Sequence, residues 1–133
     1  MKNNKFASID IGLKRIGTAL CLSSGLVSPK NAILRKNRNQ AANEVDTFLE
    51  EWEIDTLVIG LPKSNDEMQR RINHFVNLLK FKGNIEFQNE DMSSVEAEEL
   101  MKGEIQYKRD GRIDSLAAKI ILERYLFGLQ QQQ

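Results

Sequence analysis

The chain has 133 residues, 41% of them hydrophobic, with equal numbers of acidic and basic side chains and a net charge of zero. This composition predicts one soluble globular domain over 1–129 and a disordered glutamine tail at 130–133. The apolar runs are too short to span a membrane, and the N-terminus lacks the apolar core of a signal peptide. We therefore expect cytoplasmic residence and no membrane partner.

The single cysteine and single histidine narrow the possible chemistry. Cys21 alone forms no internal disulfide and no cysteine-based zinc site, and its apolar surroundings favour a small buried hydrophobic role. His74 follows a helical pattern beside Phe75, which favours a surface residue or one satisfied by a partner. Serine or cysteine triads and multi-histidine metal sites are therefore disfavoured.

The first part of the chain has the pattern of an antiparallel meander. Strand-like segments at 6–10, 16–22 and 26–34 follow one another with turn residues between them. Apolar residues then recur at helical spacing over 39–52, which predicts a helix with one side in the core.

The remaining segments alternate between strand and helix patterns. The expected elements are a buried strand at 56–60, a helix through 68–79 capped by Gly83, a strand at 84–90, a helix opened by a capping box at 93–96, a basic loop at 103–112 and a last helix over 114–127. This order predicts an α/β fold with a five-stranded mixed sheet, a three-strand meander plus parallel strands, and helices on both faces. Ligands in such sheets gather at the carboxyl ends of the strands.

Three acids are the candidates for chemistry. Asp10 ends the first strand, where an acid is a poor β-former and is costly to desolvate; Glu90 ends the last strand and Asp114 opens the final helix. Converging carboxylates raise one another's pKa values, and a divalent cation relieves this repulsion. Oxygen ligands of this kind suit Mg²⁺ or Mn²⁺, and two such ions would activate a water and stabilise the leaving oxygen of a phosphodiester.

Each acid also has a competing interpretation. Asp114 is equally compatible with a helix N-cap, Glu90 with a solvent-facing strand end, and Asp91 could replace Glu90 as a ligand. Asp10 with its glycine turn also resembles the phosphate loop of actin-like ATPases. Those proteins hold the nucleotide between two domains, and a chain of this length supplies no second wall.

Basic residues form short clusters beside predicted loops. They are Lys14-Arg15, Arg35-Lys36-Arg38, Arg70-Arg71 and Lys108-Arg109-Arg112. Any one cluster is most simply a solvated surface, whereas the set favours a composite phosphate-binding surface. The zero net charge argues weakly against a strongly cationic nucleic-acid binder.

Several motifs occur in a fixed order along nearly the whole chain: Asp10-Ile11-Gly12, Lys14-Arg15-Ile16-Gly17, Gly60-Leu61-Pro62, Glu90 followed by Ser93-Ser94-Val95-Glu96-Ala97, and Ile113-Asp114-Ser115-Leu116-Ala117-Ala118. Together they resemble the YqgF/RuvX family, which has the ribonuclease H-like fold. The resemblance implies a metal-dependent endonuclease that processes the 5′ end of pre-16S rRNA in ribosome biogenesis. The alternative within the family is a Holliday junction resolvase acting on branched DNA.

The resemblance also implies roles for individual residues. The acidic site that catalyses and holds metal would be Asp10, Glu90 and Asp114. The phosphate contacts would come from Lys14, Arg15, Lys108, Arg109 and Arg112, with Ser93 and Ser94 as auxiliary hydroxyls. Asp91 departs from the family pattern, which has arginine there, so this position either makes no phosphate contact or supplies an extra metal ligand.

The expected partners follow from the same resemblance. They are RNA or branched DNA and pre-ribosomal particles, bound by a monomer or a homodimer. A non-catalytic RNA-binding module of ribosome assembly is the alternative from another functional class.

Overall fold

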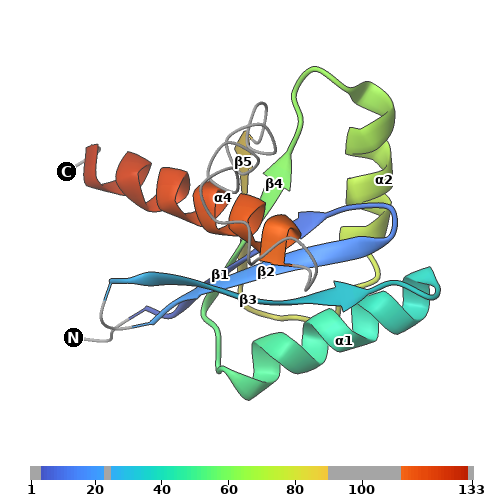
Figure 1. Cartoon of the computed structure of the whole chain (residues 1–133), viewed down its shortest axis with the longest axis horizontal. Coiled ribbons are helices and arrows are strands. Elements are labelled where there is room, and N and C mark those ends of the chain that lie inside the picture. Colours follow the sequence, from blue (N-terminus) through green and yellow to red (C-terminus); the bar gives the residue numbers. More distant parts are fainter. Residues whose placement is uncertain (1–3, 23–24, 90–111, 132–133) are drawn as a thin grey trace.

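A five-stranded mixed sheet forms the centre of the computed structural model, which describes residues 4–22, 25–89 and 112–131 (Figure 1). The strands are β1 (Phe6–Ile11), β2 (Arg15–Cys21), β3 (Val27–Leu34), β4 (Thr56–Leu61) and β5 (Asn84–Asn89). Their order across the sheet is β3-β2-β1-β4-β5. The first three pair antiparallel, while β4 runs parallel to both β1 and β5. The predicted meander followed by parallel strands is confirmed.

Helices cover both faces of this sheet (Figure 1). α1 (Arg38–Glu51) and α2 (Asp66–Val76) lie on one face, and α4 (Arg112–Gln131) crosses the other. The buried residues of α1 and α2 form a core cluster with the odd-numbered residues of β1, whereas α4 packs on buried residues of β2, β3 and β4. None of the described helices is long and apolar enough to cross a membrane.

Alternation along β1 sends its side chains to both faces of the sheet, one covered by α1 and α2 and the other by α4. Ala7, Ile9 and Ile11 are buried in the cluster with α1 and α2. Ser8 points to the other side, where its fully buried hydroxyl donates to the carbonyl of Ala118 in α4 at 2.6 Å. Because successive side chains of a strand point to opposite faces, Asp10 lies on the α4 side of the sheet.

Local signals in the sequence explain where α1 and α2 begin. Asn37 and Gln40 form a reciprocal capping box at the start of α1. At the start of α2, the Asn65 side chain accepts from the amide of Met68, and two acids in the first turn complement the helix dipole.

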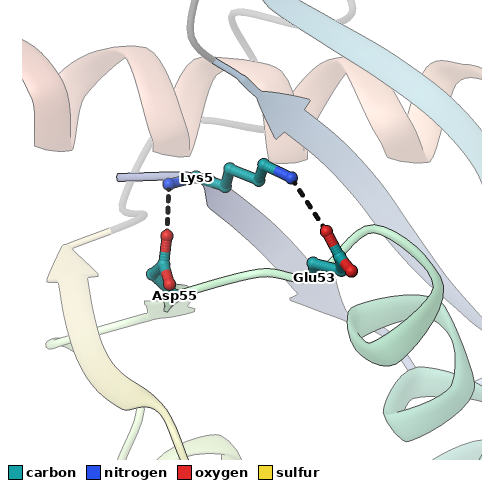
Figure 2. A network of polar contacts seen from close by, with 3 residues as sticks. All are labelled: Lys5, Glu53 and Asp55. Atoms are coloured by element: carbon teal, nitrogen blue, oxygen red, sulfur yellow. Dashed lines mark hydrogen bonds and ion pairs between the residues drawn. The ribbon is translucent and has the colours of Figure 1, made fainter. Parts of the chain in front are cut away.

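A polar network ties the beginnings of β1 and β4 together, at the edge of the sheet away from Asp10. Figure 2 shows Lys5 between two acids: its amide donates to Asp55 Oδ2 at 2.8 Å, and its ammonium lies 3.2 Å from Glu53 Oε1. The amides of Asp55 and Thr56 both donate back to the Lys5 carbonyl. This network fixes the alignment of the two strands.

The predicted cap of α2 at Gly83 is wrong. The helix ends at Val76, with Asn77 as its C-cap. Gly83 instead permits a close approach of two chain segments, because a Cβ at this position would lie 2.5 Å from the carbonyl oxygen of Asp55. That carbonyl accepts a hydrogen bond from Asn84 at the start of β5.

The boundaries of the last helix also differ from the prediction. α4 begins at Arg112, so Asp114 stands inside its first turn and is not the N-cap. The helix continues to Gln131 and so includes part of the predicted disordered tail. The predicted helix opening at 93–96 lies outside the described residues.

Candidate functional site

Asp10 is half-buried near the end of β1, between two glycines on the neighbouring strands. On one side it pairs directly with Gly17 of β2. On the other, the parallel register places Ile9 opposite Ile59, so Gly60 of β4 lies level with Asp10. Since neither glycine carries a side chain, the adjacent strands place no side chain beside the carboxylate. The positions directly opposite Asp10 on both neighbouring strands therefore carry no side chain.

The start of α4 is anchored close to Asp10. The hydroxyl of Ser115 accepts from the amide of Thr18 at 3.3 Å and donates to the carbonyl of Lys30. Thr18 follows Gly17, the pairing partner of Asp10. The anchor thus brings the first turn of α4, with the backbone of Asp114, over β2 beside the acid.

The end of β5 reaches the same edge of the sheet. Gly60 pairs with Gln88 and Leu61 with Asn89, the last residue of β5. Since β1, β4 and β5 are parallel and in register, their carboxyl ends lie side by side. The chain therefore leaves β5 toward Glu90 at the edge that carries Asp10.

The remaining predicted site residues fall outside what the structure describes. They are Glu90, Asp91, Ser93, Ser94, Lys108 and Arg109, together with the side chains of Arg112 and Asp114. Within residues 4–22, 25–89 and 112–131, no group of three or more His, Cys, Asp or Glu side chains is placed to hold a metal ion. The acidic triad stays a prediction, with one member placed and the backbone of a second beside it.

The basic turn after Asp10 has a defined geometry. The amide of Gly12 donates to the carbonyl of Arg15 at 2.9 Å, and both Lys14 and Arg15 are exposed. A Cβ on Gly12 would lie 2.8 Å from that carbonyl oxygen, so the turn requires glycine. The two basic side chains therefore stand at the edge of the sheet that carries Asp10.

Arg35 stabilises this turn from the opposite face of the sheet. It was not among the predicted site residues. Its guanidinium donates to the carbonyl of Gly12 at 2.6 Å and lies 5.4 Å from the ring centre of Phe75. Burial, and then the positive charge of Arg38, lower the pKa of Arg35 from its ordinary value. The sequence signal was present as a basic cluster, but only the fold shows that Arg35 positions the turn next to Asp10.

Cys21 and His74 have the structural roles expected for them. The Cys21 thiol is 4% exposed, and burial raises its pKa. His74 is exposed on α2, where its Nε2 accepts from Arg38 at 2.9 Å. Cys21 packs against α4 but pairs with Phe6 at the start of β1, away from Asp10, and His74 lies on the opposite face of the sheet. Neither is therefore placed for nucleophilic catalysis beside Asp10.

The mixed sheet in the order β3-β2-β1-β4-β5, with an acid near the end of the central strand, defines a ribonuclease H-like α/β protein. Two solved structures share this fold. The fowlpox virus Holliday junction resolvase matches with a TM-score of 0.52 and 16% identity over 94% of this chain and 99% of that chain. The same resolvase in complex with Holliday junction DNA matches with a TM-score of 0.58 and 14% identity over 94% and 98%.

The chain belongs to the RuvX family, whose model, described as Holliday junction resolvase, matches residues 4–127. Curated relatives carry the name "Putative pre-16S rRNA nuclease". One from Sulfurovum sp. is 61% identical over 92% of this chain and 98% of its own length. Another, from Sulfurimonas denitrificans, is 55% identical over 92% and 96%. The family is one of nucleases, as the sequence motifs predicted.

Proposed function

We propose that this chain is a metal-dependent endonuclease that hydrolyses phosphodiester bonds in pre-16S rRNA, at the 5′ end, during ribosome biogenesis. The observation that carries the proposal is Asp10, held between Gly17 and Gly60 where β1, β4 and β5 end. The names of the curated relatives support the choice of substrate. We place this activity in the cytoplasm, on RNA or pre-ribosomal particles, with the protein acting as a monomer or homodimer.

The donor set fits Mg²⁺ or Mn²⁺. Asp10, Glu90 and Asp114 supply only carboxylate oxygens, the ligands that these ions prefer, and no side chain stands directly opposite Asp10 on β2 or β4. When bound, a pair of such ions would lower the pKa of an attacking water and stabilise the leaving oxygen. Asp10 would hold metal from the sheet, Glu90 from the end of β5, and Asp114 from α4.

The basic turn supplies the contacts to substrate. Lys14 and Arg15 are exposed beside Asp10, where they can neutralise phosphates next to the scissile bond. Lys108, Arg109 and Arg112 would add contacts from the segment that precedes α4. The turn is preorganised by Gly12 and Arg35, so binding does not need to order it.

The decisive experiment compares the wild-type chain with Asp10→Asn on a pre-16S 5′ fragment, with Mg²⁺, Mn²⁺ or EDTA. The wild type should cut the RNA only with metal, and Asp10→Asn should not cut it although its unfolding curve matches the wild type. Equal cleavage by the variant would show that Asp10 is not a catalytic residue. RNA binding by the wild type without metal-dependent cleavage would instead identify a non-catalytic assembly module.

Resolution of branched DNA is the second candidate, favoured by the description of the family model and by the resolvase structures. Junction resolution requires two coordinated cuts, which need two active sites. Paired nicks on a four-way junction, with a dimer in light scattering, would establish this activity. A monomer that leaves the junction intact while cutting the RNA would exclude it.

A further inference from the structure

A cationic cavity lies on the opposite side of the sheet from Asp10. It has a volume of about 540 Å³, and its polar lining consists of Arg35, Arg38, Arg70, Arg71, Glu67 and His74. The arginines come from two basic clusters that are far apart in the sequence, one at the end of β3 and the start of α1, the other on α2. The fold therefore concentrates positive charge that the zero net charge of the chain conceals.

The charges in this cavity are only partly compensated. Glu67 pairs with Arg71 at 2.9 Å, and it is the only carboxylate among the described residues that line the cavity. Arg38 donates to Nε2 of His74, and Arg35 donates to the carbonyl of Gly12, so neither pairs with a carboxylate in these contacts. Within the part of the chain that the structure describes, the exposed guanidinium of Arg70 has no hydrogen-bond or ion-pair partner. The balance of charge therefore favours an anionic ligand.

The cavity and the candidate active site are separated only by the end of β1, on opposite faces of the sheet. Ile11, which lines the cavity, directly follows Asp10, and Leu13 of the β1–β2 turn lines it as well. Consecutive strand residues point to opposite faces, so the acid and the cavity lie on the two sides of the same turn. Figure 1 shows this turn, the start of α1 and α2 at one end of the molecule. A chain of phosphates that crosses the turn can reach both places.

We propose that this arginine cavity binds backbone phosphates of the same nucleic-acid strand that is cut at Asp10, beyond the scissile bond; this rests on the proposed function. Guanidinium groups bind phosphates through paired, charge-assisted hydrogen bonds. Phosphate contacts of this kind fix the register of the strand without reading its sequence. The cavity thus determines which phosphate of the nucleic acid reaches Asp10. The nucleic-acid strand leaves the active site around the β1–β2 turn.

The test measures nucleic-acid binding in EDTA, separately from cleavage. Arg38→Gln/Arg70→Gln is compared with the wild type on a labelled pre-16S fragment and a labelled four-way junction, by fluorescence anisotropy at several salt concentrations. We expect Kd to rise about tenfold for the double variant. The slope of log K against log salt should fall by about one for each phosphate that the variant no longer neutralises.

Lys82→Gln is the matched control, because it removes a positive charge from an exposed residue near the start of β5, at the other edge of the sheet. Its Kd should stay within about twofold of the wild type, because Lys82 does not line the cavity and lies away from the proposed phosphate contacts. Superimposable circular dichroism and unfolding curves for all variants exclude misfolding. Wild-type affinity and salt slope in the double variant would overturn the inference.

Further outcomes separate this inference from the proposed function. If the wild type does not cleave but the double variant loses binding, the nuclease proposal fails and the phosphate cavity stands. If the wild type cleaves and the double variant binds as tightly, the cavity proposal fails alone. If the double variant loses binding of free phosphate or a mononucleotide while nucleic-acid binding is unchanged, the ligand is a small anion and the inference is overturned.

Discussion

The hydroxyl of Ser115 bridges β2 and β3: it accepts from the amide of Thr18 in β2 and donates to the carbonyl of Lys30 in β3. These bonds lie where the pairing of the two strands is irregular. The register of these strands shifts between Ile16 and Thr18. Irregular pairing of this kind leaves backbone groups without a partner in the ladder and is common beside active sites. One helical side chain both repairs the sheet and fixes the position of α4 next to Asp10.

Ser115→Ala should lower both stability and cleavage. The variant removes the Ser115 partner of the buried Thr18 amide and of the partly buried Lys30 carbonyl, which costs about 2–3 kcal/mol in the free energy of unfolding. Freed from this anchor, the first turn of α4 would no longer hold Asp114 over β2, so kcat should fall. Urea denaturation and single-turnover cleavage measure the two effects. Thr47→Ala, at an exposed position of α1, is the control and should change neither. Unchanged stability in Ser115→Ala would contradict the anchor.

Gly60→Val should block the site while preserving the sheet. Valine favours strands, but here its side chain would stand beside Asp10 in the space that we assign to metal and substrate. We expect kcat to fall by about 100-fold or more, as for small displacements in an active site. Mn²⁺ titration by calorimetry should show weaker binding. Full activity in the variant would mean that the space beside Asp10 is not used.

Asp55→Ala should destabilise the protein without changing its chemistry. The variant removes the acceptor for the Lys5 amide at the edge of the sheet away from Asp10, at a cost of about 1–2 kcal/mol. Glu53→Gln, which weakens only the exposed ion pair with Lys5, should cost about 0.5 kcal/mol or less. Denaturation gives both values. At a temperature where both variants are folded, their kcat should match that of the wild type. A lower kcat in Asp55→Ala would show that the two ends of β1 are coupled.

The Cys21 thiol should react slowly in the folded protein. Burial raises its pKa, so at pH 8 it is protonated and inaccessible, whereas in the unfolded chain it ionises at its ordinary pKa. Alkylation in buffer should be at least about 100-fold slower than in denaturant. Because the unfolded thiol loses its proton first, the contribution of Cys21 to stability falls as the pH rises from the unfolded pKa to the higher folded pKa. Fast alkylation under native conditions would show that β2 opens readily.

The sequence predicted the sheet well because alternation and buried runs depend on near neighbours. The strands from 6 to 34, the parallel strand after Thr56 and the location of Asp10 at a strand end are confirmed. The functions of Ser115 and Gly83 were missed because each depends on a segment distant in the chain: Lys30 in one case, Asp55 in the other.

The arginine cavity was hidden for the same reason. Its two clusters, around Arg35 and Arg70, resemble ordinary solvated surfaces when taken one at a time. Packing of α2 against the end of β3, seen in the stacking of Arg35 on Phe75, is what joins them. Local pattern carries no information about which basic clusters meet.

The contact between Lys5 and Asp55 also determines which face of the sheet carries the candidate site. A strand displaced by one residue turns all of its side chains over. If β1 slid by a single position against β4, Asp10 would enter the apolar core beneath α1 and α2, and Ile9 or Ile11 would face α4 in its place. The alignment made where β1 begins thus selects the side of the sheet on which the acid stands, and a one-residue insertion or deletion between Lys5 and Asp10 would exchange the two sides.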